Sequence, residues 1–106
     1  MRIISGQFKG KKIQEPKDKL TRPLKDLTKE SIFNILNHSN LLNLDLKKSN
    51  VLDLFSGVGS FGLECISRGA LSVTFFENYP NAVKILKSNI SNVNAQKKVS
   101  LYENNL

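Results

Sequence analysis

The sequence predicts an α/β protein whose later part is a β-α-β-α-β unit, half of a doubly wound parallel sheet. The first observation that predicts this sheet is a nearly continuous apolar run at residues 51–55, as expected for a parallel strand that is buried on both faces. Shorter apolar segments at 73–76 and 99–102 predict two more strands. Helical patterns fill both gaps, the first over 60–68 and the second after Pro80, a favourable first-turn residue.

An N-terminal hairpin, loop and helix precede this unit. Apolar residues and glycines across residues 2–13 indicate a short β-hairpin. Asp26 is a suitable N-cap for a helix that runs to about Asn37. The predicted apolar face of that helix comprises Leu27, Ile32, Ile35 and Leu36. The sequence therefore predicts two units, a basic N-terminal unit over 1–45 and half of a sheet domain over 46–106.

The net charge of +7 is concentrated near the N-terminus. Residues 1–29 hold nine lysine and arginine side chains against three acidic ones. Such a block attracts polyanions because their condensed counterions are released on binding. A lysine-rich surface can also serve solubility alone, but the clustering favours a nucleic-acid partner. The side chains that we expect to contact it are Lys9, Lys11, Lys12 and Arg22.

The cysteine content and hydropathy limit the class of protein. Cys65 is the single cysteine, which excludes an intrachain disulfide or a multi-cysteine metal site and predicts a small buried residue. No apolar run approaches the ~18 to 20 residues of a membrane span. The first residues also lack a secretory signal pattern. We therefore expect a cytoplasmic protein without a membrane partner or a metal site.

The motif that carries chemistry is the G-x-G-x-x-G sequence of residues 57–62. It follows a predicted strand and opens a predicted helix, which is the context of a nucleotide-binding loop. Asp53 lies four residues before the first glycine. Its negative charge opposes the pyrophosphate of NAD and suits the ammonium and sulfonium groups of S-adenosylmethionine. A structural role for Asp53, capping the loop amides, is the alternative.

Glu77 ends the second predicted strand, 24 positions after Asp53. An acid at this place can accept hydrogen bonds from both hydroxyls of a ribose. NAD also uses such an acid, so Glu77 predicts a ribose without choosing between the two cofactors.

Three stretches of the chain resemble a known family. They are residues 1–10, residues 21–23 leading to 30–36, and residues 53–64 continuing to 67–70. On these stretches the chain is similar to the RsmD family, bacterial enzymes that methylate a guanine N2 in small-subunit ribosomal RNA. The resemblance implies a Rossmann-like methyltransferase fold with S-adenosylmethionine as cofactor.

The resemblance also implies roles for individual residues. Glu77 would hold the ribose, and Asn104 would stand near the adenine amine, where the family commonly has an aspartate. Arg22, between Thr21 and Pro23, would lie near the cofactor and the target base, although it could instead be a surface cation. The residues that would surround the methionine part of the cofactor are Asp53, Ser56, Gly57 and Gly59.

One family motif is missing from the sequence. The family holds the target amine with an Asp/Asn-Pro-Pro-Phe/Tyr sequence after a fourth strand, whereas the prolines here are Pro16, Pro23 and Pro80. We therefore expect the catalytic residues beyond Leu106 and the 106-residue chain to be an inactive piece of a longer protein.

Three alternatives stay open at this point. They are a methyltransferase of the same fold that acts on DNA or another RNA, a basic RNA-binding module without catalysis, and a dehydrogenase, which Asp53 disfavours.

Overall fold

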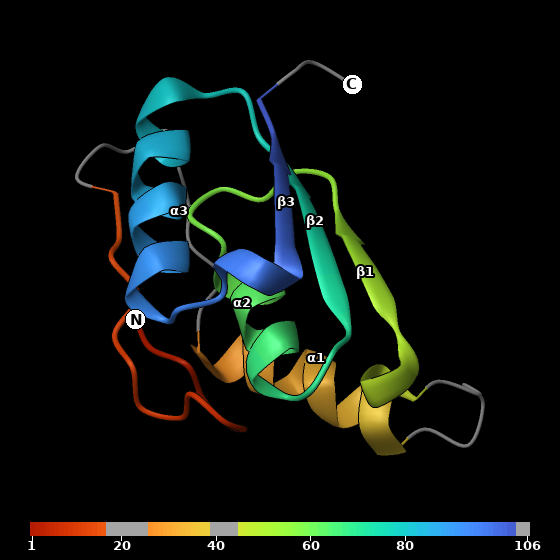
Figure 1. Ribbon diagram of the computed structural model, residues 1–106. Coiled ribbons are helices and arrows are strands. Elements are labelled where there is room, and N and C mark those ends of the chain that lie inside the picture. The colour runs from red at the N-terminus through yellow and green to blue at the C-terminus, as the bar shows by residue number, and fades with distance from the viewer. Residues whose placement is uncertain (17–25, 39–44, 104–106) are drawn as a thin grey trace.

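A parallel three-stranded sheet in the order β1-β2-β3 forms the centre of the computed structural model, which describes residues 1–16, 26–38 and 45–103 (Figure 1). In this sheet Val51 pairs with Val73, and Val73 with Val99. The strand bounds are Asn50–Asp53 for β1, Ser72–Phe76 for β2 and Val99–Tyr102 for β3. The β-α-β-α-β order predicted from the sequence is confirmed.

Two crossover helices connect the strands, as a parallel sheet requires. Helix α2 spans Ser60–Ser67 and α3 spans Pro80–Asn92, and both lie on the same side of the sheet (Figure 1). Short 3-10 helices at Leu46–Lys48 and Gln96–Lys98 precede β1 and β3. Within the described ranges, no helix has the length and apolar character needed to cross a membrane.

The two faces of the sheet differ in their exposure. On β2, Val73 and Phe75 face the helices and are fully buried. On β1, however, Leu52 is 59% exposed, and Phe55 in the turn after the strand is 84% exposed. The prediction that residues 51–55 are buried on both faces is therefore wrong. The reason is that β1 is an edge strand of the described sheet and no described helix covers the opposite face.

Residues 1–16, which we call the basic segment, follow the path of the predicted hairpin but do not form its two regular strands. Two antiparallel arms meet at a single bridge between Arg2 and Lys12, and the Ile3 amide donates to the Lys11 carbonyl at 2.9 Å. A regular ladder does not form because many backbone groups of the segment bond instead to side chains of α2 and α3. The segment is therefore docked on the helices.

Helix α1, Asp26–His38, packs across α2 through aromatic contacts. The ring of Phe33 stacks on that of Phe61, with centroids 5.2 Å apart. The Arg68 guanidinium lies 4.3 Å from the centre of the same Phe33 ring, a distance suited to a cation–π contact. Phe33 thus joins α1 to both ends of α2.

The buried face of α1 differs from the predicted one. Leu27 and Ile35 belong to the predicted apolar face but are 77% and 60% exposed. Lys29 and Phe33, four residues apart, are fully buried instead. A lysine can occupy the buried face because its ammonium group meets the carboxylate of Glu64 at 3.3 Å.

Candidate functional site

The glycine loop, residues 56–60, joins the end of β1 to the first turn of α2. Gly59 has a φ of +92°, and a Cβ at this position would collide with the side chain of Leu86 on α3. A Cβ at Gly62 would collide with the ring of Phe75 on β2. Glycine is therefore required at both positions, once for its left-handed backbone and once for close packing of α2 on the sheet.

Ser56 ties the start of this loop to the strand ends. Its amide donates to the Phe76 carbonyl at 3.1 Å. Its hydroxyl lies 2.9 Å from the Asp53 carbonyl and 3.1 Å from that of Phe76, and its one proton serves one of them at a time. The hydroxyl therefore faces the backbone of β1 and β2, and its contact with a cofactor stays a prediction.

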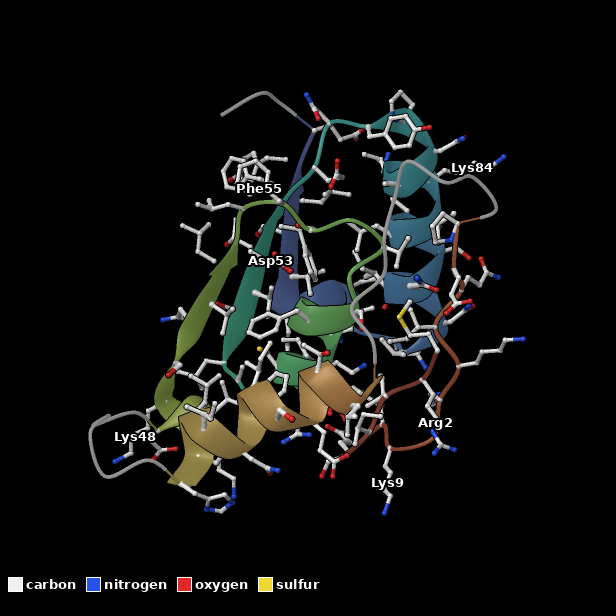
Figure 2. All side chains as sticks on the ribbon, turned by 180° about the vertical axis from the view of Figure 1, so that it is seen from behind. Arg2, Lys9, Lys48, Asp53, Phe55 and Lys84 are labelled. Atoms are coloured by element: carbon white, nitrogen blue, oxygen red, sulfur yellow. The ribbon has the colours of Figure 1, made fainter. Side chains whose placement is uncertain are left out.

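Asp53, the last residue of β1, carries an unsatisfied carboxylate oxygen (Figure 2). Its Oδ2 atom is buried and has no hydrogen-bond partner among the described residues. The pKa of Asp53 is raised to about 6, and burial is the main cause of the increase. A hydrogen bond with the Gly62 backbone opposes this increase, and the charge of Glu77 adds to it. A buried acceptor without a donor is costly. Asp53 is thus a ready acceptor for a cationic donor from a ligand.

Glu77 directly follows β2 and caps the glycine loop. Its Oε1 accepts the Gly57 amide at 2.7 Å, and its Oε2 accepts the amides of Asn78 and Tyr79 at 3.1 and 3.0 Å. Glu77, rather than Asp53, therefore accepts the Gly57 amide. A carboxylate has about four acceptor sites, so a ribose diol would have to share or displace one backbone donor.

The two carboxylates fit S-adenosylmethionine better than a dinucleotide. Asp53 and Glu77 stand at the carboxyl ends of neighbouring parallel strands, where open α/β sheets bind their ligands. The unpartnered Asp53 oxygen suits an ammonium group, and Glu77 suits a ribose. The negative charge of Asp53 would oppose a pyrophosphate. The structure brings together Asp53, Ser56, Gly57, Gly59 and Glu77, while Arg22 and Asn104 lie outside the described residues.

Cys65 lies behind this site in α2 and is 1% exposed, as the sequence predicted. Burial raises the pKa of its thiol to about 12, and the nearby charges of Asp53 and Glu64 add to the increase. The thiol therefore stays protonated and packs as a small apolar group. Over the described ranges, no group of three or more histidine, cysteine and acidic side chains could hold a metal ion.

Sequence reasoning missed three buried polar side chains behind the glycine loop. Lys29 and Glu64 are fully buried, and Asn89 is 1% exposed. A signal was present for Glu64, which is the one acidic residue in the apolar and small sequence of α2. Lys29 and Asn89 carry no such signal, because each lies in a helix that is otherwise rich in polar residues.

The cations of the basic segment are exposed but not equivalent. Lys9 and Lys12 are exposed, whereas the Lys11 ammonium lies 3.4 Å from the Asn92 carbonyl near the end of α3. Arg2 and Lys9 lie toward the opposite end of the molecule from Phe55 (Figure 2). The Arg2 and Lys9 side chains therefore lie away from the turn that precedes the glycine loop, and the contact of the basic segment with RNA stays a prediction.

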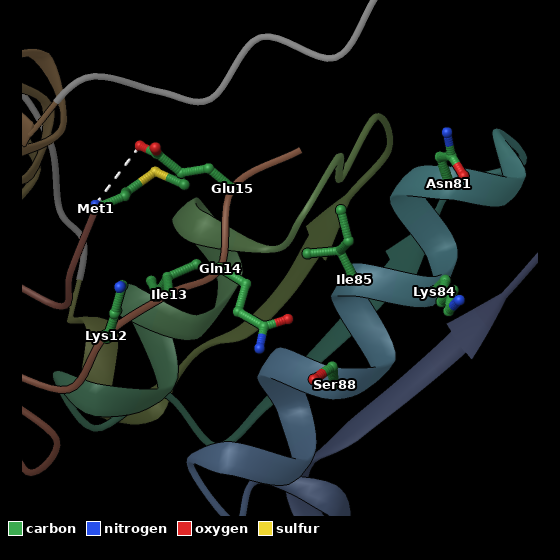
Figure 3. Close-up of a pocket in the computed structure, with 9 residues that line it drawn as sticks. All are labelled: Met1, Lys12, Ile13, Gln14, Glu15, Asn81, Lys84, Ile85 and Ser88. Atoms are coloured by element: carbon green, nitrogen blue, oxygen red, sulfur yellow. Dashed lines mark ion pairs between the residues drawn. The ribbon is translucent and has the colours of Figure 1, made fainter. Parts of the chain in front are cut away.

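A groove of about 950 Å³ lies between residues 12–15 of the basic segment and residues 81–88 of α3 (Figure 3). Its one acidic residue, Glu15, lies 3.5 Å from the amino group of Met1, which leaves Lys12 and Lys84 as its other charged groups. The groove contains none of the predicted cofactor residues. Its lining comprises Met1, Lys12, Ile13, Gln14, Glu15, Asn81, Lys84, Ile85 and Ser88.

Comparison with known proteins identifies relatives over most of the chain. The family model described as conserved hypothetical protein 95 matches residues 1–106. Ribosomal RNA small subunit methyltransferase D of Buchnera aphidicola subsp. Baizongia pistaciae is 39% identical over 87 residues, which cover 82% of this chain and 42% of that protein. The protein of the same name from Haemophilus influenzae is 37% identical over 90 residues, covering 85% and 44%. The chain spans about half the length of the curated relatives it matches.

Solved structures agree with this relationship. The Escherichia coli protein yhhF has a TM-score of 0.81 and 28% identity, and the match covers 99% of this chain and 52% of that one. A hypothetical protein of Thermus thermophilus has a TM-score of 0.80 and 25% identity, with coverage of 100% and 56%. The Rossmann-like fold predicted from the sequence is therefore confirmed. Together with the family match, these findings confirm the resemblance, and the chain belongs to the RsmD family.

Proposed function

We propose that the protein is an S-adenosylmethionine-dependent methyltransferase that methylates guanine N2 in small-subunit ribosomal RNA. The observation that carries the proposal is the buried, unpartnered Oδ2 of Asp53 beside the glycine loop of an RsmD-family chain. The names of the relatives support ribosomal RNA as the substrate class.

In this proposal the cofactor supplies an electrophilic methyl group, and the protein binds and orients it. Asp53 holds the ammonium group, and Glu77 holds the ribose hydroxyls. The glycine loop lets the backbone approach the methionine part, with Asn104 at the adenine and Arg22 near the target base. We assign no catalytic residue within residues 1–106. Residues 46–106 would thus form the cofactor half, and 1–45 would contact RNA.

The substrate can be tested directly with the full-length protein. We expect transfer of labelled methyl groups from S-adenosylmethionine to small ribosomal subunits that lack the modification, with N2-methylguanine as the product identified by mass spectrometry. Duplex DNA and unrelated RNA serve as controls. If either control is methylated and the ribosomal RNA is not, the proposed substrate is wrong. The protein would then act on DNA or on another RNA.

The basic segment can be tested by the salt dependence of RNA affinity. Each phosphate contact contributes roughly 0.7 to 0.9 to the slope of log affinity against log salt concentration. Changing Lys9→Ala and Lys12→Ala together should therefore reduce the magnitude of that slope by roughly 1.4 to 1.8. Lys11→Ala should have a smaller effect on the slope because the Lys11 ammonium already lies near the Asn92 carbonyl.

A matched control removes the same charge elsewhere. Lys47 and Lys48 are exposed in the 3-10 helix before β1, and Lys48 lies on the other side of the molecule from Lys9 (Figure 2). Lys47→Ala with Lys48→Ala should leave the slope almost unchanged. An equal loss of slope in both double variants would show that only net charge matters.

A further inference from the structure

Lys29, on α1, connects the basic segment to the glycine loop. Its fully buried ammonium donates to the Arg2 carbonyl at 2.9 Å and to the Ser60 hydroxyl at 3.1 Å. It also lies 3.3 Å from Oε1 of Glu64. Arg2 belongs to the basic segment, and Ser60 is the residue that follows Gly59. One side chain on α1 therefore contacts both functional parts of the chain.

Asn89 on α3 makes a second connection of the same kind. Its Nδ2 donates to the Val58 carbonyl at 2.9 Å and to the Gln14 carbonyl at 3.2 Å. Its Oδ1 accepts the Gln14 amide at 2.8 Å. Val58 lies between Gly57 and Gly59, so Asn89 joins the glycine loop to the other arm of the basic segment.

The tip of the basic segment lies far from the glycine loop. The tip of the basic segment is held at the far end of α2, where the Gln7 amide donates to the Ser67 carbonyl at 2.7 Å and the Phe8 amide donates to the Ser67 hydroxyl at 2.9 Å. The glycine loop is at the near end of this helix, roughly 12 Å away along an eight-residue axis. The relative position of segment and loop is therefore not set by direct contact between the tip and the loop.

The free energy of burial does not explain why Lys29 and Asn89 occupy the interior. Desolvating an ammonium or an amide is costly, and apolar side chains of similar volume often stabilise a core at least as well. Hydrogen bonds, in contrast, are directional, so each side chain fixes the orientation of the backbone groups that it bridges. Lys29 and Asn89 hold the loop through Ser60 and Val58, the residues on either side of Gly59.

We propose that Lys29 and Asn89 are positioning residues that fix the glycine loop relative to the basic segment, so that bound cofactor and bound RNA meet in a set geometry. The inference rests on the proposed function. Methyl transfer requires the sulfur, the methyl carbon and the attacking nitrogen in line, and a displacement of about 1 Å can cost about 100-fold in rate. Loss of either connection should misalign the two ligands while each still binds.

The test uses the full-length protein and the variants Asn89→Leu and Lys29→Met. The maximal rate of methyl transfer should fall about 10- to 100-fold. The dissociation constants for S-adenosylhomocysteine and for RNA, measured separately by calorimetry, should change little. Asn92→Leu places the same substitution at an exposed position of the same helix and should leave the rate unchanged. Lys29→Arg keeps a cationic donor and should recover most of the rate.

The outcomes separate this inference from the proposed function. No transfer to ribosomal RNA by the unaltered protein would overturn the proposed function and the inference with it. Normal transfer by both Asn89→Leu and Lys29→Met would overturn the inference alone. A rate loss matched by an equal loss of S-adenosylhomocysteine sites would also overturn it, because the variants would then be misfolded rather than misaligned.

Discussion

The affinity of the full-length protein for S-adenosylhomocysteine is expected to fall about tenfold between pH 7.5 and pH 5. The ligand keeps its ammonium group throughout this range, whereas Asp53, with a pKa of about 6, becomes mostly protonated. One pH unit below that pKa, roughly one tenth of the carboxyl groups are ionised. Because the ammonium group prefers the ionised carboxylate, binding should strengthen as the pH rises through 6, which calorimetry can follow.

Asp53→Asn is the control for this pH dependence. The amide has the shape of the carboxyl group but no charge, so affinity should be lower at pH 7.5 and nearly constant with pH. NAD should not bind the unaltered protein, because the Asp53 carboxylate places negative charge beside the glycine loop. A pH dependence that survives in Asp53→Asn would assign it to another group, and tight binding of NAD would contradict the choice of cofactor.

The same pKa predicts the pH dependence of folding without ligand. Burial raises the pKa of Asp53 from 3.8 to about 6, so the folded protein binds more protons than the unfolded chain between these values. The free energy of unfolding should therefore decrease as the pH rises from about 4 to about 6. Asp53→Asn should lose this contribution.

Glu64→Ala is expected to lower the free energy of unfolding by about 3 to 5 kcal/mol. The fully buried carboxylate accepts the Ile4 amide at 2.8 Å and the Ser5 amide at 3.0 Å. It also accepts Nε of Arg68 at 2.8 Å and pairs with the buried ammonium of Lys29. Removing it leaves a buried cation without its counter-charge and two backbone donors without an acceptor. Urea unfolding of the full-length protein measures the change.

An exposed ion pair supplies the comparison. Lys87 and Glu103 lie 3.0 Å apart, but their side chains are 57% and 53% exposed. Glu103→Ala should cost no more than about 1 kcal/mol, because water and salt screen the pair. A loss in Glu64→Ala no larger than in Glu103→Ala would show that the buried group contributes little to stability.

Local patterns in the sequence were sufficient to predict the elements and the glycine loop. The strands at 73–76 and 99–102 and the helix after Pro80 appear close to their predicted bounds, because period, caps and glycines act over a few residues. The same patterns predicted that Asp53 and Glu77 would flank the loop, since both follow strands that run in parallel.

Burial could not be predicted as well, because it depends on what packs against an element. The sequence pattern of α1 predicts Leu27 and Ile35 on its apolar face, yet both are exposed. The apolar run of β1 predicted burial on both faces, but the face that carries Leu52 is exposed in the described sheet. A periodic pattern identifies an amphipathic element without identifying the surface that covers it.

The sequence by itself thus determined the order of strands and crossover helices, the glycine loop and the family, because these features reside in short contiguous stretches. Only the tertiary structure decided that Lys29, Glu64 and Asn89 lie buried together with the backbone of the basic segment. These residues come from three different helices. A polar side chain is stable in the interior only when it finds hydrogen-bond partners there. For these three residues the partners come from distant parts of the chain, so a local sequence pattern does not predict their burial.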